Sequence, residues 1–253
     1  MSDITTTPPE QTTPDWLQRP LLAVLTLDWE KVIYITFIIA AIITRFWDLG
    51  SRVMSHDESL HTQFSYQYYN GDGYVHSPLM HGPFLFHITA AFYWLFGPGD
   101  FAARAPVAIL GVILVVMPYY FRPWIGRVGA IFASFLLLIS PYITYYSRYI
   151  RHDIYVIVWA LIVFLGIWWY LHYREEKHLW WFAAGMALMF ATKEVSYIYV
   201  AIFGSLLLWR IGLKVLKSDW FWAQLPNLRN ALLVLAASIV LIGIGGAVMT
   251  SGG

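Results

Sequence analysis

Apolar residues in this chain gather into long stretches, and the polar residues fall between them. A helix needs about 20 mostly apolar residues to cross the hydrocarbon core of a bilayer. Seven stretches approach that length, and they are Lys31–Trp47, Phe101–Phe121, Val128–Ser147, Ile154–Tyr173, Leu179–Thr192, Ser196–Trp209 and Ala231–Thr250. The pattern predicts an all-α integral membrane protein with about seven transmembrane helices.

An eighth apolar stretch, Pro83–Gly97, is too short to cross easily. Its 15 residues make about 22 Å of helix, against roughly 30 Å for an average hydrocarbon core. If it lies along the membrane surface, the segments on the side of the N-terminus hold ten of the sixteen Lys and Arg residues. These ten are Arg19, Lys31, Arg122, Arg127, Arg174, Lys177, Arg210, Lys214, Lys217 and Arg229. Basic loops stay in the cytoplasm, so we expect a surface helix, a cytoplasmic N-terminus and a first outer loop over Asp48–Asp100.

Composition supports a multi-pass membrane protein, and we expect it in the cell (inner) membrane. The chain is 59% hydrophobic and 12% charged, whereas soluble domains are about half apolar and a quarter charged. A net charge of +1 argues against nucleic acid as a partner. Cysteine is absent, which excludes disulfides and thiolate metal sites. We expect a cytoplasmic polar tail over residues 1–30, then a membrane module over residues 31–253 that forms the N-terminal part of a longer protein.

The first outer loop contains an acidic cluster at Asp57-Glu58. Ser55, followed three residues later by Glu58, is a capping-box pattern that predicts the start of a helix. Asp57 then lies in the first helical turn, where the helix dipole favours its ionised form. One hypothesis makes these acids part of a reaction centre. The alternative is that they only cap a helix at the membrane surface.

Two further polar clusters lie on the same predicted side. Arg148, Arg151 and Asp153 follow the third span, and two arginines beside one acid leave a cation that suits a phosphate. Lys193-Glu194 separates the fifth and sixth spans, where Lys193 is a second candidate for a phosphate contact. In both places the alternative is a local salt bridge with no further role.

The tripeptide His81-Gly82-Pro83 opens the short surface helix, and proline suits the first helical position. His81 either donates to a phosphate or is an ordinary loop histidine. The eight histidines suggest a metal site only weakly, because no HxxH or HExxH motif is present and His56 and His61 are too far apart for one helical face.

Taken in order, these residues resemble the N-terminal half of the GT-C glycosyltransferases, which include dolichyl-phosphate-mannose protein mannosyltransferases and bacterial aminoarabinose transferases. The resemblance covers roughly Val32 to Val200. Its motifs are Asp57-Glu58, His81-Gly82-Pro83, Arg104-Ala105-Pro106, Ser140-Pro141, Tyr146-Ser147-Arg148, Asp153 and Thr192-Lys193-Glu194. The Asp-Glu and His-Gly-Pro motifs look most like the subgroup of flippase-activity-associated membrane proteins.

The resemblance implies a GT-C-like module with two juxtamembrane helices on the outer face. It implies inverting transfer of a sugar from a polyprenyl-phosphate donor. Asp57 would be the base, with Glu58 as its neighbour or substitute, and Asp153 would orient a partner or share a divalent cation with Asp57. The candidates that would hold the donor phosphate are Arg148, Arg151, Lys193 and His81. Two alternatives stay open, a non-catalytic transmembrane subunit of a larger complex and a component of a lipid-linked-sugar flippase.

Overall fold

The computed structural model describes residues 28–76 and 80–251, and every regular element within these ranges is a helix. The chain divides into two compact units, Met1–Glu194 and Val195–Gly253. Most of the predicted tail, residues 1–27, lies outside the described residues. The main helices are α2 (Trp29–Phe46), α3 (His56–Tyr69), α4 (Phe84–Phe96), α5 (Asp100–Val116), α6 (Pro118–Ile139), α7 (Pro141–Tyr146), α8 (Asp153–Tyr173), α9 (Lys177–Phe190), α10 (Ser196–Leu216) and α11 (Asp219–Ser251).

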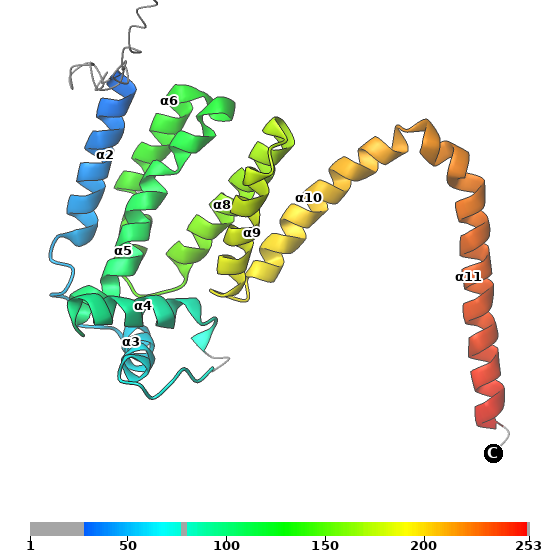
Figure 1. The fold of residues 1–253 in the computed structure, drawn as a ribbon, viewed down its shortest axis with the longest axis horizontal. Coiled ribbons are helices and arrows are strands. Elements are labelled where there is room, and N and C mark those ends of the chain that lie inside the picture. Colours follow the sequence, from blue (N-terminus) through cyan, green and yellow to red (C-terminus); the bar gives the residue numbers. More distant parts are fainter. Residues whose placement is uncertain (1–27, 77–79, 252–253) are drawn as a thin grey trace, which may run out of the picture. The chain divides into compact units, whose positions relative to one another are not determined.

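The first unit is a layer of long helices with two short helices at one end. Figure 1 shows α2, α5, α6, α8 and α9 running side by side, and α2 packs on α5 and α6, α5 on α8, and α8 on α9. Within the described residues, Asp100–Ile139, Asp153–Tyr173 and Ser196–Leu216 are long and apolar enough to cross a membrane. The all-α membrane architecture is therefore confirmed, while the number of seven spans stays a prediction.

The segment Asp100–Ile139 breaks at Gly126. There φ is 74° and ψ is 164°, a left-handed backbone conformation that glycine adopts at no steric cost. The break falls inside the basic connection that the charge pattern predicts, between Arg122 and Arg127. Both arginines pair with the carboxylate of Glu30 at the start of α2, at 3.2 and 3.6 Å. These pairs tie together the end of the unit that lies farthest from α3 and α4 (Figure 1).

The short helix α4 lies across the layer. Figure 1 shows it crosswise to α5 at the end where α2 finishes, with α3 packed against it. Its exposed side chains include Trp94, Leu95 and Phe96, and aromatic rings are enriched where protein meets the membrane surface. The orientation fits the surface helix predicted at Pro83–Gly97, and the side of the membrane on which it lies stays a prediction.

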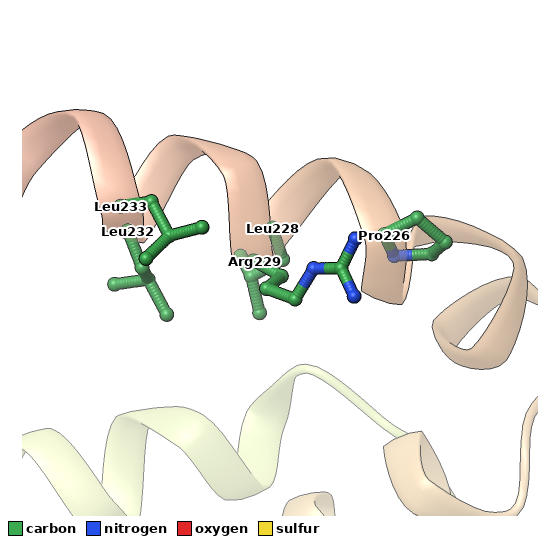
Figure 2. A pocket seen from close by; sticks show the side chains of 5 residues that line it. All are labelled: Pro226, Leu228, Arg229, Leu232 and Leu233. Atoms are coloured by element: carbon green, nitrogen blue, oxygen red, sulfur yellow. The ribbon is translucent and has the colours of Figure 1, made fainter.

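The second unit consists of α10 and α11, whose described side chains are largely exposed. Five side chains of α11 line a groove of about 480 Å³ (Figure 2), and they are Pro226, Leu228, Arg229, Leu232 and Leu233. Four are apolar and one is a guanidinium. The groove brings together no acid and base that could perform chemistry.

Candidate functional site

A polar cavity of about 220 Å³ lies at the end of the first unit where α3 and α4 are found. Its lining comes from four segments far apart in the sequence, and the residues are Asp57, Leu60, His61, Met80, His81, Arg151, His152 and Lys193. Four of these, Asp57, His81, Arg151 and Lys193, are residues that the sequence analysis nominates. The fold thus gathers the three polar clusters and the His-Gly-Pro motif around one cavity.

Cations and acids alternate in a row, Lys193, Asp153, Arg151 and Asp57, of which all but Asp153 line the cavity. The ammonium of Lys193 lies 3.0 Å from a carboxylate oxygen of Asp153. The Nε atom of Arg151 lies 3.6 Å from the other oxygen of that carboxylate, and its terminal nitrogen lies 4.0 Å from Asp57. Asp153 is therefore held between two cations, whereas Asp57 has one distant partner and a side chain that is half exposed. Of the two carboxylates, Asp57 is the less engaged by cations.

Asp57 and Asp153 are poorly placed to share a divalent cation. Within the ranges 28–76 and 80–251, no group of three His, Asp or Glu side chains is placed to hold a metal ion. Moreover, the guanidinium of Arg151 lies between Asp57 and Asp153. The two carboxylates, as the structure places them, therefore do not fit a shared divalent cation.

Glu58 has a different environment from its neighbour Asp57. The predicted capping box is confirmed, since the side chain of Ser55 accepts from the backbone of Glu58 and the carboxylate of Glu58 accepts from the backbone N–H of Ser55. The same carboxylate accepts from Arg52 at 2.8 Å and from Arg104 at 3.0 and 3.3 Å. It also accepts from the backbone N–H of Ile150. Glu58 thus joins α3, α5 and the segment before α8.

The electrostatics of Glu58 make it unsuited to proton transfer. Burial alone would raise the pKa of this fully buried carboxyl, but the hydrogen bonds from Arg104 and Ser55 and the charges of Arg104 and Arg52 outweigh burial. The net result is a pKa below the usual value for glutamate. A carboxylate with five hydrogen bonds and a lowered pKa is a structural anchor that holds Asp57 at the cavity.

The His-Gly-Pro motif works through its backbone. The N–H of Gly82 donates to the carbonyl of Thr192 at 3.1 Å, and the N–H of Phe84 donates to Ala191 at 2.9 Å. A Cβ atom on Gly82 would lie only 2.3 Å from the carbonyl oxygen of Ala191, so glycine is required for this close approach. The motif therefore fastens the start of α4 to the turn after α9.

This fastening places two side chains at the cavity. His81 adopts a left-handed backbone conformation with φ of 61°, and its Nδ1 atom lies 2.7 Å from the carboxylate of Glu194. The hydrogen bond and charge of His81 help to keep the pKa of Glu194 below its usual value, although partial burial acts in the opposite direction. On the same turn, Lys193 reaches Asp153.

Arg148 is absent from the cavity lining, as are Glu58 and Asp153. The guanidinium of Arg148 donates to the backbone carbonyls of Thr44 and Asp48 at 3.1 and 3.3 Å. These carbonyls lie at the end of α2, where the helix dipole favours a cation. Arg148 therefore caps α2 in this structure.

Two histidines of the cavity, His61 and His152, are not predicted as site residues from the sequence. His61 is 7% exposed and His152 is 2% exposed, and their ring centroids are 5.1 Å apart. Burial, together with nearby positive groups, lowers the pKa of His61 to about 4 and that of His152 to about 2. The sequence does offer a signal for His152, since it directly precedes the nominated Asp153. It offers none for His61, because the position of this residue on the inner face of α3 depends on tertiary packing.

Comparison with known proteins places this architecture in a family. The family model described as dolichyl-phosphate-mannose-protein mannosyltransferase matches residues 80–242. The crystal structure of ArnT from Cupriavidus metallidurans in the apo state matches with a TM-score of 0.59 and 20% identity. That match covers 81% of this chain and 40% of ArnT, so the chain spans less than half of the solved protein. No curated protein matches the chain.

The family match covers more than half of the chain, and the ArnT match supports the same fold independently of the motifs. The resemblance drawn from the motifs is therefore confirmed at the level of the GT-C class, and the subgroup of flippase-activity-associated proteins stays a prediction. The chain is a membrane protein with a GT-C fold and belongs to the dolichyl-phosphate-mannose-protein mannosyltransferase family.

Proposed function

We propose that the chain is the N-terminal, donor-binding part of an inverting glycosyltransferase that takes a sugar from a polyprenyl-phosphate carrier at the outer face of the membrane. The observation that carries the proposal is the convergence of Asp57, Arg151 and Lys193 on one polar cavity, with Asp153 paired to both cations. A non-catalytic subunit or a flippase component would not need a half-exposed acid in the same cavity as two cations.

Different residues in the row of charges Asp57, Arg151, Asp153 and Lys193 perform different steps of the reaction. Asp57 accepts the proton of the acceptor hydroxyl while the oxygen of that hydroxyl attacks the anomeric carbon. The bond between that carbon and the phosphate oxygen breaks, and the electron pair leaves with the lipid phosphate. Lys193 and Arg151 stabilise the departing phosphate. Inversion follows because attack and departure take place on opposite faces of the sugar.

Asp153 prepares the two cations for the donor. Its carboxylate holds Lys193 at 3.0 Å and Arg151 at 3.6 Å before any phosphate arrives. An incoming phosphate replaces part of these contacts, because charge-assisted bonds to a phosphate are strong for both residue types. Asp153 therefore acts by positioning the cations.

The apolar rings of α4 support a location at the membrane surface. Trp94 is 80% exposed and Phe96 is 64% exposed at the end of a helix that lies crosswise to the long helices (Figure 1). Exposed rings on such a helix suit the boundary between headgroups and acyl chains. The cavity would then meet the phosphate of a lipid whose tail lies in the bilayer.

The test compares amide variants of the full-length protein reconstituted in liposomes with a polyprenyl-phosphate sugar. Asp57→Asn keeps the shape of the side chain and removes the base, so transfer should fall by at least a hundredfold, the usual scale of general-base catalysis, with donor binding largely kept. Lys193→Ala should instead weaken donor binding. Asp72→Asn, at an exposed turn after α3, is the matched control and should leave transfer unchanged. Unchanged transfer in Asp57→Asn would exclude the proposed base.

A further inference from the structure

We propose that His61 and His152 form a second subsite in the cavity, one that hydrogen-bonds hydroxyl groups of the donor's sugar beside the cations that hold its phosphate. The inference rests on the proposed function and extends it from the phosphate to the sugar. The proposal assigns a role to two cavity residues that have no part in the proposed proton transfer or phosphate binding.

Both histidines are buried and incompletely bonded. They line the same cavity as Asp57, Arg151 and Lys193. Among the described residues, no group hydrogen-bonds the Nδ1 atom of His61 or the Nε2 atom of His152. A buried polar atom without a partner costs about 1–3 kcal/mol. A ligand that supplies the missing hydrogen bonds removes this cost when it binds.

The bonding of His152 defines the partner it requires. A hydrogen bond with the Gly82 backbone favours the protonated form of the ring and raises its pKa, although burial lowers the pKa far more. An uncharged imidazole has one N–H donor and one lone-pair acceptor, and Nε2 of His152 has no partner among the described residues. The matching ligand group is a hydroxyl, which can both donate and accept, and which a sugar has and a phosphate diester lacks.

Charge separates the two subsites. Desolvation, aided by His81, Arg151 and Lys193, keeps the pKa of His61 near 4, even though Asp57 acts in the opposite direction. Both rings are thus uncharged near neutral pH. Lys193 and Arg151 carry fixed charges that suit a phosphate, whereas uncharged imidazoles suit hydroxyl groups. The cavity is therefore divided between an ionic part and a neutral part.

The histidine pair is held rigidly before any ligand binds. Phe86 packs against both rings, with centroid distances of 5.8 Å to His61 and 6.5 Å to His152. His81 adds an edge contact to His152 at 5.1 Å. Preorganised groups lose little entropy on binding, so the pair can discriminate between sugars by the positions of their hydroxyl groups.

The experiment measures binding of two probes to the full-length protein in nanodiscs. One probe is a polyprenyl-phosphate hexose, drawn from a panel of mannosyl, glucosyl and galactosyl lipids, and the other is bare polyprenyl phosphate. His152→Leu should lower affinity for the preferred hexosyl lipid about tenfold, equivalent to about 1.4 kcal/mol, and change affinity for the bare lipid less than twofold. His152→Gln, which keeps hydrogen-bonding capacity, should recover part of the loss. Lys193→Ala should weaken both probes.

Each outcome is decisive for one of the two proposals. Equal losses for both probes in His152→Leu would overturn the sugar subsite and leave the proposed function intact. Wild-type protein that binds neither probe would overturn the proposed function itself. If His152→Leu fails to fold, the wild type is titrated with monodeoxy sugar lipids against His152→Gln. One deoxy position should weaken the wild type more than it weakens His152→Gln, and the absence of any such position would contradict the subsite.

Discussion

Two acids that are adjacent in the sequence occupy opposite environments. Glu58 is fully buried and accepts hydrogen bonds from two arginines and two backbone N–H groups. Asp57 has a half-exposed side chain, and its ion-pair partner Arg151 is 4.0 Å away. One acid has its bonding capacity used by the protein, and the other keeps that capacity for a ligand. The dipeptide therefore combines a structural anchor and the acid that we propose as the base.

The same division of labour recurs at the other motifs of the site. Gly82 serves the contact with the turn after α9, while His81 beside it faces the cavity. Arg148 caps α2, while Arg151, three residues later, pairs with Asp153 beside the cavity. In each motif one residue holds the backbone in place, and a nearby residue faces the cavity. Stability and chemistry should therefore respond to different members of each pair.

The largest predicted effect is the loss of the anchor. Glu58→Gln leaves Arg104 buried without a counter-charge, and breaking a buried ion pair costs about 3–5 kcal/mol. We expect a pronounced drop in the thermal unfolding temperature of the purified protein in detergent, followed by intrinsic fluorescence. Asp57→Asn, the same chemical change one residue earlier, should alter stability by less than about 0.5 kcal/mol. Similar melting curves for the two variants would remove the distinction between the acids.

The second effect is a dependence of stability on pH that comes from the buried histidines. Their pKa values in the folded protein, about 4 for His61 and about 2 for His152, lie below the 6.5 of an unfolded histidine. As pH falls below 6.5 toward 4, the unfolded chain binds protons that the folded chain does not. Stability is thus greatest above pH 6.5 and declines by about 1.4 kcal/mol per pH unit for each histidine.

This pH dependence can be measured by melting the protein between pH 7.5 and 5. His61→Gln should flatten the slope, because it removes one group that titrates in the unfolded state only. His56→Gln, at an exposed position on the same helix, is the control and should keep the wild-type slope. A slope unaffected by His61→Gln would mean that this ring titrates normally in the folded protein.

A smaller effect is expected where α4 meets the turn after α9. Gly82→Ala forces a Cβ atom to within 2.3 Å of the Ala191 carbonyl oxygen, and relieving such an overlap typically costs about 1–3 kcal/mol. Because the backbone must shift, Lys193 should lose its position and donor binding should weaken as well. Gly204→Ala, in α10 with open space around it, should leave both quantities unchanged. Binding that survives Gly82→Ala would show that the turn holds Lys193 without this contact.

The sequence predicts the helical membrane fold and the clustering of polar motifs because both depend on local patterns. Apolar stretches mark the helices, and the alternation of chain direction brings every second connection to the same end. The burial of Glu58 could not be predicted in this way, since its partners Arg104 and Ile150 lie 46 and 92 residues away. His61 and His152 escape for the same reason, because 91 positions of chain separate two rings that touch in the fold.

The smallest predicted effect concerns the two arginines of one segment. Arg148 contacts the carbonyls of Thr44 and Asp48, so Arg148→Gln should cost about 0.3–1 kcal/mol of stability, as the loss of a cation at a helix C-terminus does, and change donor affinity less than twofold. Arg151→Gln removes a cation from the cavity and should weaken donor binding about tenfold at constant melting temperature. Both quantities are obtained from one set of nanodisc samples. If Arg148→Gln weakened donor binding as strongly as Arg151→Gln, the phosphate would extend beyond the cavity toward α2, and both arginines would belong to the donor site.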